Sequence, residues 1–171
     1  VCVNTEGNII FWTPQAEKMF GWREYEVIGK KVFDVIVPER YRKDQVDGLQ
    51  NYLITGESKL LNRVVEHNAL RRSGIEFPIE ILIIPVKEDG NEFFCSFIRD
   101  ITERKLAEKN LIDSEKKYRN IFQNSPLPNW IFDPETLMFL EVNNSAIRNY
   151  GYSREEFLEM TIKDIRPEED I

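Results

Sequence analysis

The first part of the chain alternates between short β-rich runs and helical stretches. Val1–Asn4 and Ile9–Trp12 are apolar runs separated by a turn that contains Gly7, a pattern typical of a hairpin. Glu39–Thr55 has helical spacing, and Gly56 supplies its stop. Three longer strand-like runs with turn residues between them follow: Asn62–Leu70, Phe77–Val86 and Glu92–Ile101. Because short turns join antiparallel neighbours, this order predicts an α+β fold with one sheet and helices on one face.

The alternation within the last two runs places apolar side chains on both faces of the predicted sheet. One face receives Phe77, Ile79, Ile81 and Ile83, together with Phe94, Ser96 and Ile98. A sheet buried on one face only would show polar residues on the other. We therefore expect the opposite face to pack against a flanking helix or a partner subunit, through Leu82, Ile84, Phe93 and Phe97.

Two segments of the chain repeat each other. Ala16–Val35 and Ala146–Ile165 align so that Phe20-Gly21-Trp22 matches Tyr150-Gly151-Tyr152. Two amphipathic helices can look alike by chance, but an aromatic-Gly-aromatic triplet in register favours a true repeat. The sequence predicts one domain over residues 1–102 and the N-terminal half of a second over 125–171. Because an isolated hairpin is marginal in water, we expect residues 129–171 to be loosely packed alone or to borrow contacts.

Residues 103–124 are charged and rich in helix formers, which predicts a helical linker. Small or apolar residues recur in it at spacings of three and four: Ala107, Leu111, Ser114, Tyr118 and Ile121. This seam is typical of a coiled coil, but a single amphipathic helix folded back on its own domain shows the same pattern. Both alternatives stay open.

Composition excludes several function classes. The formal charge of −7 argues against nucleic-acid binding, since phosphate contacts need an excess of Lys and Arg. The longest apolar run, Ile81–Ile84, is too short to cross a membrane, although the parent protein could be anchored elsewhere. Cys2 and Cys95 have no spacing that demands a disulfide, which indicates a reducing, cytoplasmic compartment. The sequence contains no phosphate-binding glycines and no nucleophile–base set, so we expect no catalysis by this chain.

Several motifs resemble those of PAS domains with their PAC extension. They are Phe97-Ile98-Arg99-Asp100-Ile101-Thr102-Glu103-Arg104-Lys105, the upstream segments Asn4–Gly7, Ala16–Trp22, Arg71–Gly74 and Phe77–Glu80, and Asn124-Ser125-Pro126 before the second copy. The resemblance covers almost the whole chain. It implies a PAS fold with a five-stranded antiparallel sheet, helices on one face and a small pocket, here expected without its N-terminal flanking helix.

The resemblance also implies dimerisation, and passage of a signal from the last strand into an exit helix. Asp100, Thr102 and Arg104 lie at that joint and are the implied transmission residues. A carboxylate and a hydroxyl at a helix start can bond free backbone N–H groups and so fix the exit angle. An ordinary helix cap uses the same groups, and the two roles are compatible.

Eight residues are expected to line the pocket: Phe33, Ile36, Leu49, Tyr52, Val65, Ile81, Phe94 and Ser96. Such a lining suits a small apolar or aromatic molecule. A core filled by its own side chains is the alternative.

The cofactor stays unknown. Flavin photosensors of the family need a reactive cysteine in the region that corresponds to residues 29–38, where none is present. Haem sensors carry a proximal His on the long helix, where Gln45 stands, and Gln is a poor iron ligand. The single histidine, His67, lies in a strand-like run and is interpreted as structural, so no metal site is predicted.

Taken together, these features indicate a signal-relay and dimerisation module. Tandem arrays of this kind resemble the input regions of sensor histidine kinases. We expect a homodimer formed through the outer sheet face and the linker helix, with an output domain downstream. The alternative is a sensor that binds a small molecule or cofactor and feeds a diguanylate cyclase or a chemotaxis-type transducer.

Overall fold

The chain forms two compact units, Val1–Ala107 and Glu108–Ile171. The structure is a computed structural model that describes residues 1–58, 60–88 and 90–166. None of the described helices is both long and apolar enough to cross a membrane.

The first unit is built on a five-stranded antiparallel sheet with the order β2-β1-β5-β4-β3, which confirms the predicted fold class. The strands are β1 Cys2–Asn4, β2 Ile9–Phe11, β3 Val64–Leu70, β4 Glu76–Glu88 and β5 Asn91–Asp100. β4 and β5 pair in register from Ile79↔Asp100 to Glu88↔Asn91. Since β5 pairs with β1 on its other side, the first strand lies beside the strand that leads out of the domain.

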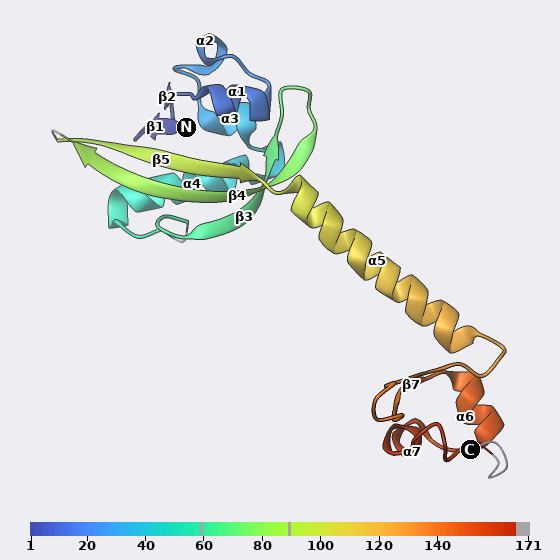
Figure 1. The fold of residues 1–171 in the computed structure, drawn as a ribbon. Coiled ribbons are helices and arrows are strands. Elements are labelled where there is room, and N and C mark those ends of the chain that lie inside the picture. The colour runs from blue at the N-terminus through green and yellow to red at the C-terminus, as the bar shows by residue number, and fades with distance from the viewer. Residues whose placement is uncertain (59, 89, 167–171) are drawn as a thin grey trace. The chain divides into compact units, whose positions relative to one another are not determined.

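The crossover from β2 to β3 carries a series of helices, which Figure 1 labels. They are α1 Pro14–Phe20, α2 Glu24–Val27, α3 Val32–Ile36 and α4 Glu39–Thr55. Thr13 caps α1 because its hydroxyl accepts a hydrogen bond from the backbone N–H of Ala16 at 3.1 Å. Gly21 ends α1 with a φ of 80°, and Gly56 ends α4 with a φ of 73°, both in the left-handed region that glycine tolerates.

The core of the first unit lies on one face of the sheet. The ring of Phe20 packs against Trp12 and Phe77, with centroid distances of 5.4 and 5.7 Å. Phe77 and Phe94 are at most 4% exposed. Burial of rings of this size stabilises the fold by roughly 1.5–3 kcal/mol each. On the opposite face, Phe97 is 61% exposed.

The chain leaves the sheet through α5, Thr102–Asn124, where the sequence predicts a helical linker. Of the predicted seam, Leu111, Tyr118 and Ile121 are all exposed. Phe122 is the buried residue of this helix. A coiled coil formed by the exposed seam stays a prediction.

The second unit repeats the start of the first. β6 Trp130–Phe132 and β7 Phe139–Val142 form a hairpin, followed by α6 Asn144–Tyr150 and α7 Arg154–Glu159. The side chain of Asn143 caps α6 as Thr13 caps α1, and Gly151 ends α6 with the same φ of 80° as Gly21.

Packing in the second unit involves more than the hairpin, and the expected looseness or borrowing of contacts stays a prediction. The described part has a core in which no side chain is more than 9% exposed: Phe139, Val142, Ala146, Phe157 and Ile162. The ring of Phe157 meets Phe139, Tyr152 and Tyr150 edge-on, with centroid distances of 5.3, 5.7 and 6.2 Å. The prediction weighed only the short hairpin, whereas α7 supplies the aromatic ring that covers it. Residues 167–171 lie outside the described part.

Candidate functional site

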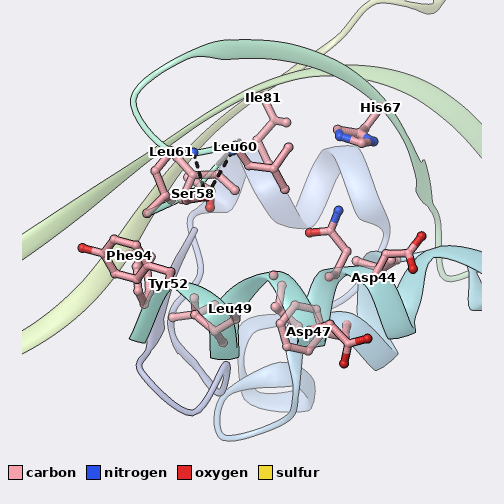
Figure 2. A pocket seen from close by; sticks show the side chains of 18 of the residues that line it. Asp44, Asp47, Leu49, Tyr52, Ser58, Leu60, Leu61, His67, Ile81 and Phe94 are labelled. Atoms are coloured by element: carbon pink, nitrogen blue, oxygen red, sulfur yellow. Dashed lines mark hydrogen bonds between the residues drawn. The ribbon is translucent and has the colours of Figure 1, made fainter. Parts of the chain in front are cut away.

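A cavity of about 580 Å³ lies between the inner face of the sheet and helices α3 and α4 (Figure 2). Leu49 on α4 lies across it from Ile81 on β4, and Phe94 on β5 lies beside Tyr52 of α4 at one end. Cavities of roughly 300–1,000 Å³ with mainly apolar walls are typical of sites for small organic molecules. The predicted alternative, a core filled by its own side chains, is therefore not what the structure shows.

The structure brings together seven of the eight residues predicted for a pocket: Phe33, Ile36, Leu49, Tyr52, Ile81, Phe94 and Ser96. The eighth, Val65, lines a smaller neighbouring cavity of about 60 Å³. Val65 pairs with Ile81 and faces the same side of the sheet, but it lies on the edge strand β3. Val65 thus lies on the predicted face of the sheet, but it lines the smaller cavity, whereas His67 of the same strand lines both.

Helix α4 contributes several polar residues with short or absent side chains to the lining of the cavity. The helix is described over its whole length, and none of its residues is buried. Asp44, Asp47, Gly48 and Asn51 lie along one side of it and contribute short or absent side chains to the lining. Their spacing of three and four residues marks one helical face, which is the signal that could have placed them at the cavity.

Tyr52 lies at one end of the cavity (Figure 2). Its ring meets Phe94 edge-on at a centroid distance of 5.5 Å, and its hydroxyl donates to Glu92 Oε1 at 2.8 Å. The hydrogen bond to this carboxylate raises the pKa of Tyr52, so the hydroxyl keeps its proton and stays a donor.

The turn between β1 and β2 packs closely against Phe33, another residue of the lining. Gly7 has a φ of +81°, and a Cβ at this position would lie 2.8 Å from Cε2 of Phe33. The absence of a side chain therefore lets the turn approach Phe33, which lines the cavity.

The imidazole of His67 lines the cavity from β3, at the end away from Tyr52 in Figure 2. Gln45, which stands where the resemblance puts a haem ligand, lines the cavity from α4. Among the described residues, no three His, Cys, Asp or Glu side chains are grouped so as to hold a metal ion. Cys2 and Cys95 line a different hollow.

The predicted transmission residues lie where β5 passes into α5. Asp100 Oδ1 accepts from the backbone N–H of Thr102 at 2.9 Å and from its hydroxyl at 2.6 Å. Asp100 Oδ2 accepts from Arg71 at 2.5 Å, and Arg71 also donates to the carbonyl oxygen of Met19 at the end of α1. Burial alone would raise the pKa of Asp100, but the hydrogen bonds from Thr102 and Arg71 outweigh burial and hold this pKa below its usual value.

Arg104 fastens the first turn of α5 to the sheet. Its guanidinium donates to Glu80 on β4 at 3.1 Å and to Glu66 on β3 at 2.6 Å. Lys105 forms a further ion pair with Glu66 at 2.6 Å. The hydrogen bond from Lys105 is the main cause that lowers the pKa of Glu66. Glu66 and Glu80 were not predicted as partners of Arg104, because only the pairing of β3 with β4 brings these two residues together.

The four residues predicted for a packing face lie together on the outer side of the sheet. The register pairs Leu82 with Phe97, and Phe93 with Val86, while Ile84 pairs with Cys95. These side chains form an apolar surface, defined by Leu82, Ile84, Phe93 and Phe97, that we call the outer face.

Two family models, each described as a PAS domain, match residues 1–103 and 116–170. An uncharacterized protein of Azorhizobium caulinodans is 32% identical over 111 residues, which are 65% of this chain and 15% of that protein. Sensor protein FixL of Bradyrhizobium diazoefficiens is 26% identical over 129 residues, 74% of this chain and 25% of FixL. The crystal structure of a PAS domain from Colwellia psychrerythraea superposes with a TM-score of 0.50 at 21% identity, covering 60% of this chain and 85% of that one. The matched part of the chain therefore spans a quarter or less of the length of the Azorhizobium caulinodans protein and of FixL.

Proposed function

Since the chain belongs to the PAS domain family, we propose that it relays a signal from its first domain through Asp100 and Thr102 into α5. Its likeness to sensor protein FixL supports a place in the input region of a sensor protein. The proposed parent protein is a cytoplasmic sensor histidine kinase, in which rearrangement of a homodimer passes the signal to a downstream output domain.

The single observation that carries this proposal is the network of Arg71, Asp100 and Thr102. Arg71 donates both to the end of α1 and to the Asp100 carboxylate at the end of β5, and this carboxylate accepts from Thr102 at the start of α5. Hydrogen bonds with an ionised partner are short and strong, so a displacement of α1 or β5 changes the geometry at the helix start. A network of this kind can bias an equilibrium between two helix positions.

The test uses the full-length protein that carries this region. We expect Asp100→Asn and Thr102→Val to change the unstimulated output activity several-fold while the first domain stays folded. Asp113→Asn, at an exposed position of α5, is the matched control and should leave the output unchanged. If the two network variants fold normally and retain unaltered output and stimulus response, the relay proposal is wrong.

Ligand binding in the cavity is the second candidate function. It is supported by the 580 Å³ of apolar space beside Leu49 and Ser96. In this case the first domain senses a small molecule and feeds a kinase, a diguanylate cyclase or a chemotaxis-type transducer. Denaturation of the purified protein should then release a compound that mass spectrometry detects, and Ser96→Leu should reduce its amount. A folded chain that never releases or binds a small molecule would exclude this candidate.

A further inference from the structure

Cys2 on β1 and Cys95 on β5 lie directly opposite each other in the antiparallel register. Next to them, the backbone nitrogen of Val1 donates to the carbonyl oxygen of Ser96 at 3.1 Å, and the N–H of Ser96 donates to the carbonyl oxygen of Val1 at 2.8 Å. Val1 and Ser96 are therefore a hydrogen-bonded pair, which makes the cysteines a non-hydrogen-bonded pair, because the two kinds alternate along an antiparallel ladder.

This position in the ladder matters because strands approach most closely there. Cα atoms of a non-hydrogen-bonded pair lie about 4.5 Å apart, inside the range of roughly 4.4–6.8 Å that a disulfide spans. The two Sγ atoms are 2.8 Å apart. A disulfide can thus form without a change of register or of strand pairing.

Both thiols are also accessible. Each cysteine is half-buried, and both line a hollow of about 260 Å³ beside α1. Phe11, Met19 and Phe97 form apolar walls of this hollow, and Gln15 adds a polar group. Val1, Ser96 and Ile98 line both this hollow and the cavity next to α4, whereas the two cysteines line only the hollow.

We propose that Cys2 and Cys95 form a reversible thiol–disulfide site that exchanges with low-molecular-weight disulfides such as oxidised glutathione. One cysteine thiolate attacks a sulfur of the reagent, which forms a mixed disulfide and releases one thiolate. The second cysteine sulfur attacks the protein sulfur, which closes the Cys2–Cys95 bond and releases the second thiolate. The two protons lost by the cysteines are taken up by the two released thiolates, so the protein is oxidised and the reagent is reduced.

The environment favours slow exchange over rapid peroxide sensing. Burial, together with the hydrogen bond to Cys95, raises the pKa of Cys2 to about 11, so little of its thiolate exists at neutral pH. In a reducing compartment the pair stays reduced, and closure reports a change in the thiol–disulfide balance.

The consequence of closure is a covalent link between β1 and β5 five residues before Asp100. Because β5 leads into α5, the bond restrains the same strand that the relay uses, without occupying the cavity. This input goes beyond the proposed function and does not depend on it, since the exchange chemistry is measured on the cysteines alone.

The test equilibrates the 171-residue chain with mixtures of reduced and oxidised glutathione, then traps free thiols by alkylation. We expect both thiols to disappear together, in a product that has no covalent link between chains and yields a linked Cys2–Cys95 peptide. Ring closure should become at least about tenfold less favourable in urea, because the ends of a long loop seldom meet in an unfolded chain.

The single variants Cys2→Ser and Cys95→Ser serve as controls. Each should take up one glutathione and form no internal link. The proposal is overturned if the wild-type chain accumulates only mixed disulfides with glutathione, or only links between two chains. It is also overturned if closure is as favourable in urea as in the folded chain.

Discussion

Arg71 donates to the carboxylate of Asp100 at 2.5 Å and so connects the turn after β3 with the last residue of β5. The same guanidinium lies 3.7 Å from the ring centroid of Phe77 and also donates to the carbonyl oxygen of Met19. Since the other oxygen of Asp100 caps the start of α5 through Thr102, the exit of the chain from the domain depends on an arginine from a distant turn.

Replacement of Arg71 by Gln should destabilise the first unit by about 1–3 kcal/mol. An ion pair between side chains that are 29% and 31% exposed is partly screened, so most of the loss comes from the unsatisfied partners of the guanidinium. Amide exchange of β5 under native conditions measures the effect. Arg63→Gln, at an exposed site, is the matched control. Equal protection in both variants would contradict the expected role of Arg71.

Asp100 should make the free energy of unfolding of the first unit depend on pH in the acidic range. Its pKa is lower in the folded chain than the ordinary value of 3.8, so its contribution is complete above that value and is lost as the pH falls through the lower, folded pKa. Urea unfolding of the wild type and Asp100→Asn should therefore differ by about 1 kcal/mol near neutral pH. The difference should shrink below about pH 4. A difference that stays constant down to about pH 2 would show that the carboxylate charge is not involved.

Gly7 is expected to be needed both for its backbone conformation and for the space beside Phe33. A matched pair of variants separates these two effects. Gly7→Ala places a side chain at a φ of +81° and brings its Cβ to 2.8 Å from Phe33, whereas Gly29→Ala has a φ of +82° and no neighbour within 4 Å. Both lose about 1 kcal/mol through the backbone conformation, and Gly7→Ala should lose at least about 1 kcal/mol more through the contact. Thermal unfolding of the two variants measures this difference. Equal losses of stability would mean that the ring of Phe33 moves aside without an energetic cost.

The sequence predicted much of the sheet, and the reasons are local. Alternation along β4 and β5 assigns Ile81 and Phe94 to one face because side chains of a strand point to opposite sides in turn. The polar part of the cavity could not be predicted in this way, since Asp44 looks like an ordinary solvated helix residue until α4 is placed. Pairs such as Cys2–Cys95 depend on strand order, which no single run of residues encodes.

The outer face is expected to hold two copies of the chain together. Phe97 is 61% exposed and pairs with Leu82 in the middle of this apolar surface, so Phe97→Asp should shift the chain from dimer to monomer in light scattering. A charge buried in an apolar interface without a partner is strongly unfavourable. Tyr25→Asp, at a residue of α2 that is 83% exposed, is the control and should leave the dimer intact. A wild-type chain that is monomeric at all concentrations, or a dimeric Phe97→Asp, would argue against this interface.

The second unit should unfold on loss of one ring. Phe157 is fully buried at the centre of contacts with Phe139, Tyr150 and Tyr152. Removing a buried phenylalanine side chain costs about 3–5 kcal/mol, which is comparable with the whole stability that so small a core provides. In Phe157→Ala, amide exchange should therefore reach the unfolded rate in β6, β7 and α6 while β4 and β5 stay protected. Leu158→Ala, at the next position but 39% exposed, should leave both units folded. If the hairpin and α6 keep their protection in Phe157→Ala, contacts other than those of Phe157 stabilise this unit. If the hairpin and α6 show no protection even in the wild type, the core around Phe157 does not form in solution.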